Sequence, residues 1–246
     1  MHWFWRGVLD LFFPPRCQVC LAFDRSLICP ACAAAIRPLL PPYCDICGRP
    51  FDPQAKGGPL CADCRQGQSH LDIARAVNTY EGPMREAIHR FKYARKRVLA
   101  EPLGAMMSDF LRAPECGDEG QTIRIDEIDA VCPVPLHPAR VRERGFNQAE
   151  LLARAVCQTV GLTLDPSLLR HVRDTAPQVS LDRRDRAQNV RGAFAAPDRG
   201  AVEGRRLLLI DDLTTTGATL EECGRVLRRA GAASIAALTL ARAGLA

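Results

Sequence analysis

Two carboxylates and the hydroxyl-rich turn after them are the residues of this 246-residue chain best suited to chemistry. Asp211 and Asp212 stand side by side, and residues 214–219 read Thr-Thr-Thr-Gly-Ala-Thr. Adjacent carboxylates accept hydrogen bonds from a vicinal diol. Gly217 lets the backbone curl tightly, so that its amides surround an oxyanion. The pattern therefore predicts a site for a ribose that carries a 5-phosphate.

Cysteines form the second group with suitable spacing. Eight of the twelve lie in four Cys-x-x-Cys pairs, and each pair presents two thiolates from one tight turn. Two pairs complete a tetrahedral zinc site, and four thiolates leave no coordination position open, so we expect two structural zinc ions. Sequential and interleaved pairing are both open, and redox-active dithiols are the alternative interpretation. The pairs are Cys17/Cys20, Cys29/Cys32, Cys44/Cys47 and Cys61/Cys64.

A strand and a helix must hold the acidic pair. Residues 207–210 are a continuous apolar run, which is typical of a strand buried on both faces of a parallel sheet. The helix predicted for residues 220–231 closes at Gly231. In such sheets, ligands bind beyond the carboxyl ends of the strands, where a helix N-terminus offers unpaired amides to a phosphate. An ordinary strand–helix turn with acidic residues is the simpler alternative.

The rest of the pattern predicts an α/β fold, a parallel sheet flanked by helices. Further strands are expected at residues 73–80, 128–136 and 234–241, with an edge strand after residues 191–195. Helices are expected at residues 84–111, with a kink at Pro102, and from Asn147 or Gln148 to about residue 160. Residues 175–189 are long and polar, which predicts a mobile flap over the site.

The composition changes after Gly67, so we expect two units. Residues 1–68 would hold an N-terminal apolar helix and the cysteine pairs, and residues 69–246 would hold the sheet. The apolar stretch at residues 3–13 is interrupted by Arg6 and Asp10, so it predicts neither a signal peptide nor a membrane span. A cytoplasmic protein is therefore expected, and contact of this stretch with a membrane surface is the alternative.

Basic residues gather in two segments. Their charge predicts a surface for phosphate or nucleic acid, whereas a solvated helix face and loop are the plainer interpretation. If the first segment packs on the sheet and the second follows a strand's carboxyl end, the two form one positive track that opens at the site. The residues are Arg85, Arg90, Lys92, Arg95, Lys96 and Arg97, followed by Arg140, Arg142 and Arg144.

Several of these motifs resemble known families. The apolar run, the two acids and the Thr-Gly-x-Thr turn are similar to the phosphoribosyl pyrophosphate (PRPP) loop of type I phosphoribosyltransferases. Residues 142–148 read Arg-Glu-Arg-Gly-Phe-Asn-Gln, residues 91–93 read Phe-Lys-Tyr, and Arg186 precedes Asn189-Val190. With the cysteine pairs, these strings make nearly the whole chain resemble the ComF/GntX family, in which a double zinc ribbon is fused to a type I phosphoribosyltransferase domain.

The resemblance implies a bacterial protein that acts on incoming single-stranded DNA, in natural transformation or in the use of DNA as a nutrient. It also implies PRPP with Mg2+ as ligand and a competence helicase as a partner. The catalytic pair would be Asp211 and Asp212. The PRPP site would add Thr214, Thr215, Thr216, Gly217, Ala218, Thr219, Lys92, Arg142 and Arg144, and DNA would contact Arg90, Lys92, Arg95, Lys96, Arg97, Arg140, Arg142 and Arg144.

One position departs from the better-known enzymes. Hypoxanthine-guanine phosphoribosyltransferases carry an aspartate just before the Thr-Gly, and Thr215 stands there in this chain. A threonine hydroxyl does not take up a proton near neutral pH, so no acceptor-side base stands out. A phosphoribosyltransferase is therefore one expectation. A non-catalytic adaptor for DNA or a helicase and a nucleobase-salvage enzyme are the alternatives.

Overall fold

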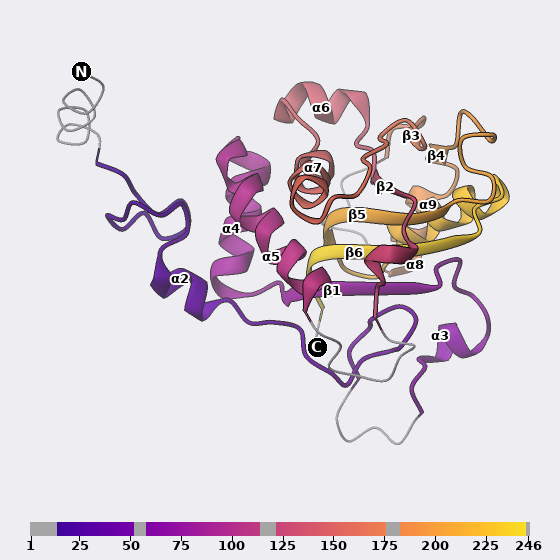
Figure 1. The fold of residues 1–246 in the computed structure, drawn as a ribbon, viewed down its shortest axis with the longest axis horizontal. Helices are drawn as coiled ribbons and strands as arrows, with labels where there is room; N and C mark the ends of the chain where they lie inside the picture. Colours follow the sequence, from indigo (N-terminus) through magenta and orange to yellow (C-terminus); the bar gives the residue numbers. More distant parts are fainter. Residues whose placement is uncertain (1–13, 52–57, 114–121, 176–182, 245–246) are drawn as a thin grey trace.

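The computed structural model describes residues 14–51, 58–113, 122–175 and 183–244, and its centre is a four-stranded parallel sheet (Figure 1). The strand order is β1-β6-β5-β2. The bounds are Ile73–Thr79 for β1, Ser234–Arg242 for β6, Arg206–Thr214 for β5 and Ala130–Pro133 for β2. A separate antiparallel pair consists of β3 (Arg170–His171) and β4 (Phe194–Ala195).

The apolar run of β5 forms the middle of the core. Leu207, Leu208, Leu209 and Ile210 have no exposed surface, because β2 and β6 pair with β5 on both edges and helices cover both faces. Alternate residues of the strand point to opposite faces, so Leu208 and Ile210 join one cluster while Leu207 and Leu209 join the other. The expected doubly buried strand is confirmed.

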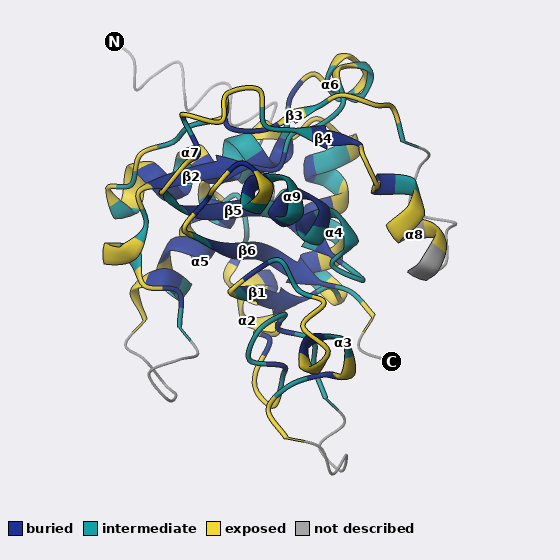
Figure 2. Ribbon diagram, turned by 90° about the vertical axis from the view of Figure 1, so that its right-hand side faces the viewer, coloured by how far each residue is buried: buried dark blue, intermediate teal, exposed yellow. Residues whose placement is uncertain are grey.

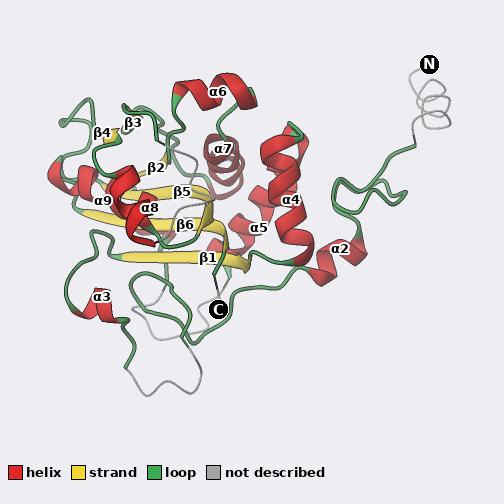
Figure 3. Cartoon of the chain, turned by 180° about the vertical axis from the view of Figure 1, so that it is seen from behind, coloured by secondary structure: helices red, strands yellow, loops and turns green. Residues whose placement is uncertain are grey.

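Helices form a layer on each face of the sheet. Figures 1 and 3 show α4, α5 and α7 together on one face, and α9 on the other. The bounds are Pro30–Ala35 for α2, Ala62–Arg65 for α3, Gly82–Tyr93 for α4, Ala100–Arg112 for α5, Pro138–Arg144 for α6, Gln148–Val160 for α7, Arg183–Val190 for α8 and Ala218–Arg229 for α9, with short 3-10 turns at Arg97–Leu99 and Ile125–Glu127. No helix of the described ranges is both long and apolar enough to span a bilayer.

The single helix predicted for residues 84–111 is wrong. The chain breaks after Tyr93, where Arg95 takes the left-handed conformation with φ 52°, and α5 starts afresh at Ala100. Pro102 causes no kink because it lies in the first turn of α5, where backbone amides have no helical acceptor. The break turns the basic stretch 94–97 into an exposed connection between two helices.

Other boundaries also differ from the predictions. The strand predicted at residues 128–136 covers only β2, since Pro133 and Pro135 supply no amide donor to continue it. Residues 138–144, expected as a basic connection, form α6, and the predicted flap contains α8 at its C-terminal end. The predicted helix at residues 3–13 and part of the flap, residues 176–182, lie outside the described residues.

The cysteine-rich segment pairs with the edge of the sheet. Leu39 N donates to Val77 O at 3.0 Å, and Thr79 N donates to Arg37 O at 2.9 Å, so residues 37–39 run antiparallel along β1. Further along the same strand, Ala74 N donates to Ile46 O at 2.6 Å. Unpaired sheet edges invite association with other chains, and here the cysteine-rich segment covers that edge. Figure 2 shows this segment, with α3, beside β1.

The close packing of α5 on α7 can be tested by substitution at the point where the two helices touch. A Cβ at Gly104 would lie 2.5 Å from the Ala155 Cβ, which is closer than two carbon atoms pack. Alanine favours a helix by about 1 kcal/mol over glycine, but overpacking costs about 1–3 kcal/mol. Gly104→Ala should therefore lower the free energy of unfolding in urea titrations. The double variant with Ala155→Gly should recover it, and a stable single variant would contradict this packing.

Candidate functional site

A cavity of about 620 Å3 opens at the carboxyl ends of the sheet strands. Its walls come from the end of β5, the exit of β2, the C-terminal part of α4, the connection between α6 and α7, and the β3–β4 pair. The acidic pair, Lys92 and three arginines, Arg85, Arg140 and Arg144, all line it. The sheet topology thus brings together residues that are more than a hundred positions apart in the chain.

The acidic pair lies within β5 rather than after it, because pairing with β6 continues to Thr214. Asp212 is buried and its Oδ1 lies 2.9 Å from the Nζ of Lys92, which comes from α4. The Asp212 amide donates to Asp211 Oδ1 at 2.8 Å. Burial alone would lower the pKa of Lys92, but Asp212 outweighs it and the pKa is raised, so this lysine stays charged. The pair and the lysine form one compact charged group.

Asp211 has an unusual protonation equilibrium. Burial, and next the neighbouring charge of Asp212, raise its pKa to about 7, and Lys92 offsets only part of this. At neutral pH the pair therefore carries between one and two negative charges. A bound cation or a set of hydroxyl donors would favour the doubly ionised form. Binding of such a ligand would therefore release a proton from the pair and increase its negative charge.

The turn after β5 separates two cavities. Gly217 has φ 87° and directly precedes α9. No side chain caps the first turn of this helix from that position. Thr215 and Thr219 face the cavity of the acidic pair, whereas Thr216 and Gly217 border a second cavity of about 450 Å3. Backbone amides at this helix N-terminus are suited to an anion. The expected turn is present at the start of α9, and its binding of a phosphate stays a prediction.

The string at residues 142–148 has a structural explanation. Gly145 ends α6 with φ 84°, and Phe146 is buried with its ring 5.5 Å from that of Phe91. Asn147 caps α7 by accepting from Ala149 N at 3.1 Å, and its amide donates to Val134 O at 3.0 Å. These contacts fix the start of α7 against the exit of β2. They place Arg144, Gln148 and Arg140 at the cavity, while Arg142 is exposed and is not among the lining residues.

Several polar atoms of the cavity have no hydrogen-bond partner in the described part of the protein. They are Arg144 Nε, Gln148 Nε2 and both ring nitrogens of His171, and all are buried. Arg144 also lies over the Tyr93 ring, with its guanidinium carbon 5.3 Å from the ring centre. A buried polar group without a partner costs about 1–3 kcal/mol. These atoms line one open cavity, where water or a polar ligand can complete their hydrogen bonds.

The cavity has an aromatic wall that the sequence analysis missed. His171 of β3 stacks on Phe194 of β4 with ring centres 4.6 Å apart, and His137 meets it edge-on at 5.4 Å. Burial, and next His137, lower the pKa of His171 to about 4, so its ring is neutral at pH 7. Two strands of two residues each produce this wall. No periodic pattern marks elements this short, so the sequence offered no signal for it.

The two basic segments lie side by side, as the expected track requires. Arg95 donates to Glu143 O at 2.7 Å, and Arg97 donates to Gly145 O while it also covers the Phe146 ring. Both arginines thus bind carbonyls at the C-terminal end of α6. Lys96 and Arg142 are exposed beside them. Arg90, in contrast, is paired with Glu86 one turn earlier in α4.

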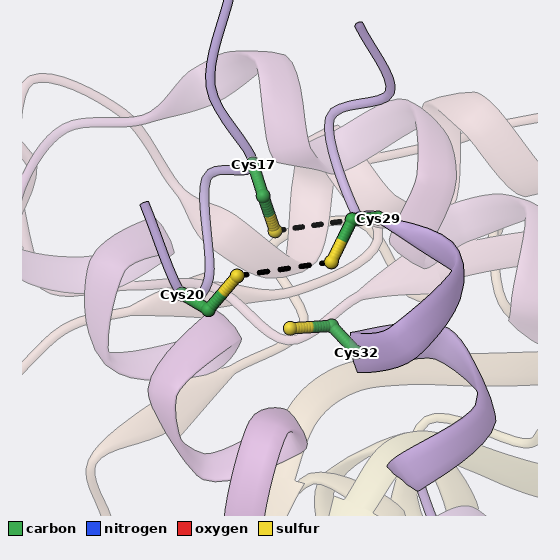
Figure 4. A group of neighbouring side chains, drawn as sticks. All are labelled: Cys17, Cys20, Cys29 and Cys32. Atoms are coloured by element: carbon green, nitrogen blue, oxygen red, sulfur yellow. Dashed lines mark hydrogen bonds between the residues drawn. The ribbon is translucent and has the colours of Figure 1, made fainter. Parts of the chain in front are cut away.

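The cysteines form two clusters, and the pairing is sequential. Cys17, Cys20, Cys29 and Cys32 make the first, and all four Sγ atoms lie within 4.8 Å of one another (Figure 4). The Cys20 and Cys29 sulfurs are 3.7 Å apart, close to the spacing of about 3.8 Å in a zinc tetrahedron with Zn–S bonds of about 2.3 Å. The donor set fits structural zinc.

The second cluster repeats this arrangement. It consists of Cys44, Cys47, Cys61 and Cys64. The Cys47 and Cys61 sulfurs are 3.7 Å apart. Burial would raise the pKa of Cys44, but N–H donors of Cys61, Cys47 and Ile46 outweigh it and lower the pKa to about 7. The turn therefore prepares a thiolate, the form that binds metal.

Comparison with known proteins finds two domains in the chain. Residues 8–66 match the double zinc ribbon domain, and residues 144–244 match the phosphoribosyl transferase domain. The chain is 30% identical to Competence protein F of Haemophilus influenzae over 184 residues, which cover 74% of this chain and 78% of that protein. It is 33% identical to Competence protein ComFC of Bacillus subtilis, with 80% and 76% covered. DNA utilization protein YhgH of Escherichia coli K12 is 30% identical, with 74% and 77% covered.

Among solved structures, the glutamine PRPP amidotransferase of B. subtilis is similar over 58% of this chain, with 20% identity and a TM-score of 0.37. The matched part is about a quarter, 26%, of that protein's length. A hypoxanthine phosphoribosyltransferase of Trypanosoma cruzi matches over 60% of this chain, with 14% identity, a TM-score of 0.32 and 65% of its own length covered.

The raised pKa of Asp211 predicts how stability depends on pH. Its usual value is 3.8 and its value in the folded protein is about 7, so the protonated folded form is favoured, and its stabilising effect is full below 3.8 and is lost as pH rises from there to about 7. Asp211→Asn stays neutral, and its side-chain oxygen can still accept from Asp212 N. We expect it to be more stable than the parent at pH 8, on the order of 1–2 kcal/mol, with a smaller difference at pH 5.

Chemical denaturation at both pH values measures this difference. Asp129→Asn is the control of opposite sign, because Arg206 lowers the pKa of Asp129 to about 2 and its replacement should reduce stability at pH 8. An effect of Asp211→Asn that is the same at pH 5 and pH 8 would show that this carboxyl titrates normally.

Proposed function

This chain belongs to the family of Competence protein F, ComFC and DNA utilization protein YhgH, and we propose that it binds PRPP with Mg2+ and single-stranded DNA during DNA uptake or utilisation. The observation that carries the proposal is the cavity itself. It joins an acidic pair, a set of buried polar atoms without partners and Thr219 in the first turn of α9, while Gly217 borders the neighbouring cavity. A ribose phosphate has groups that match all of these.

In this proposal the acidic pair holds the ribose. Asp211 and Asp212 accept hydrogen bonds from the 2′ and 3′ hydroxyls, and the amides of residues 215–219 bind the 5-phosphate. Arg144 and Lys92 lie on the side where a pyrophosphate would project, and Lys92 would turn from Asp212 towards it. Asp211 and Asp212 would hold a Mg2+ ion near them, and the ion would neutralise the charge of the departing pyrophosphate. Arg142 is exposed and reaches the ligand only if its side chain moves.

The aromatic wall is the place where an acceptor would bind in a transfer reaction. The neutral ring of His171 offers one donor and one acceptor to a planar heterocycle. Transfer would then depend on positioning and on stabilisation of positive charge at the ribose. Thr215 supplies no carboxylate beside this position. That observation favours the second candidate, a non-catalytic adaptor in the cytoplasm that carries DNA or meets a helicase, with PRPP as a regulator.

Binding of PRPP is tested by calorimetry on zinc-loaded protein with Mg2+. We expect binding by the parent and a loss of at least tenfold in Asp211→Asn, which removes about 1.4 kcal/mol or more of binding free energy. Lys96→Met is the control, because Lys96 lies four residues after Lys92 in the chain but is exposed outside the cavity. Absence of binding by the parent would refute the proposal. Release of pyrophosphate with any nucleobase would decide against the adaptor.

DNA binding should depend on phosphate contacts to the basic track. Tyr93 is 54% exposed whereas Phe146 is buried, so few rings near the track can stack on bases. Lys96 and Arg142 are exposed and do not hold α6, unlike Arg95 and Arg97. The double variant Lys96→Ala, Arg142→Ala should reduce the slope of log K against log salt by about 1.4, since each single-strand contact counts about 0.7.

Fluorescence anisotropy with a labelled oligonucleotide across a salt series measures this slope. Arg229→Ala is the control, because Arg229 is an exposed cation on α9 at the opposite face of the sheet. If the slope of the double variant equals that of the parent, the DNA binds elsewhere, and the cysteine-rich segment would be the next place to look.

A further inference from the structure

Arg242 is a buried cation whose partner is not a carboxylate. It ends β6, is 4% exposed, and donates from Nη1 to Cys47 O at 3.0 Å. Within the described ranges, no ion pair joins it to an aspartate or glutamate. A buried guanidinium is costly unless an anion lies close to it. Arg242 instead lies against the second cysteine cluster, since Cys47 accepts its hydrogen bond and Cys47 and Cys64 line the same cavity.

The anion near Arg242 is the second cysteine cluster. Four thiolates around one Zn2+ carry about two net negative charges. Arg75 of β1 is also buried, 3% exposed, and lies over the Tyr43 ring beside the same cluster. Arg49 lines the same cavity as Cys47 and Cys64, and it pairs with Asp63 at 3.1 Å. The protein thus surrounds the second site with cationic groups, two of which belong to the sheet.

The first cluster is built differently. Cys17, Cys29 and Cys32 belong to the apolar cluster of α4 and α5, next to Val19. Among the described residues, the buried arginines are Arg75 and Arg242, and both lie at the second cluster. The two sites bind the same metal with the same ligands. Only the second is joined to the sheet by charge.

Arg242 also connects this cluster to the turn of the candidate site. It is the register partner of Thr214 in β5, and the next amide, Ala243 N, donates to Thr214 O at 2.8 Å. Thr214 and Arg242 border the 450 Å3 cavity together with Cys47, Cys64 and Gly217. The cysteine cluster and the phosphate-binding turn therefore share one wall, and that wall contains Arg242.

We propose that Arg242 is the counter-charge through which zinc in the second site holds the end of β5 and the turn at residues 214–219 in place. Zinc in the first site has no such effect, since its cluster packs on α4 through apolar contacts. Loss of metal from the second site leaves Arg242 buried without its anion, and the strand ends relax. The second ribbon is thus a metal-dependent support of the candidate site as well as a cover for β1.

Zinc release to a chromophoric chelator tests the charge. In Arg242→Met, which keeps an unbranched apolar stem but removes the charged group, one of two zinc ions should bind 10–100-fold more weakly, the range for groups that orient metal ligands. Arg242→Lys keeps the charge and should restore most of the affinity. Arg16→Met is the control beside the first site, because Arg16 precedes Cys17 and is exposed. Equal zinc affinity in the parent and in Arg242→Met would overturn the proposal.

Hydrogen exchange tests the connection to the turn without using any ligand, so its outcome is independent of the proposed function. Cys20→Ser and Cys47→Ser form a matched pair, because each removes the least buried ligand of its cluster. In Cys47→Ser, exchange should accelerate at least tenfold in peptides that cover residues 207–219. In Cys20→Ser those peptides should exchange as in the parent. Faster exchange confined to residues 43–66 in Cys47→Ser, or equal acceleration in both variants, would contradict the proposal.

Discussion

The candidate site depends on how a fully buried strand ends in charge. Residues 207–210 of β5 have no contact with solvent, and the chain then places two carboxylates in the same strand. Asp212 is stable there because Lys92 reaches it from α4. Asp211 has no equal partner, and its pKa rises to about 7. Two neighbouring carboxylates therefore share one buried lysine, and all three side chains line the 620 Å3 cavity.

The helices around the site place cationic side chains near the acidic pair. Lys92 belongs to α4. After the break at Tyr93, the basic stretch 94–97 lies against α6, where Arg95 and Arg97 donate to the carbonyls of Glu143 and Gly145. Those contacts help to fix α6 and, with it, Arg140 and Arg144 at the cavity. On the other side, buried arginines of β1 and β6 face the second cysteine cluster. Cationic side chains thus lie on both sides of the acidic pair, at α4 and α6 on one side and at the second cysteine cluster on the other.

The sequence predicted the parts whose signal is local and periodic. The apolar run of β5, the glycine-closed α9 and the asparagine-capped α7 were all visible, as were the Cys-x-x-Cys turns. The sequential cysteine pairing was left open because spacing alone does not distinguish it from interleaved pairing. The break at Arg95 was missed since a positive φ at arginine has no compositional sign.

The His171–Phe194 wall and the Arg242 contact were missed for another reason. Each joins residues far apart in the chain, and only the tertiary arrangement brings them together.

A crystal structure grown with PRPP, Mg2+ and a short oligonucleotide tests the central claim most directly. The account predicts a ribose whose hydroxyls contact Asp211 and Asp212, a phosphate on the amides of residues 215–219, and Lys92 turned towards pyrophosphate. The oligonucleotide should follow Lys96 and Arg142. A cavity without PRPP at saturating ligand, with the Lys92–Asp212 pair intact, would contradict the account.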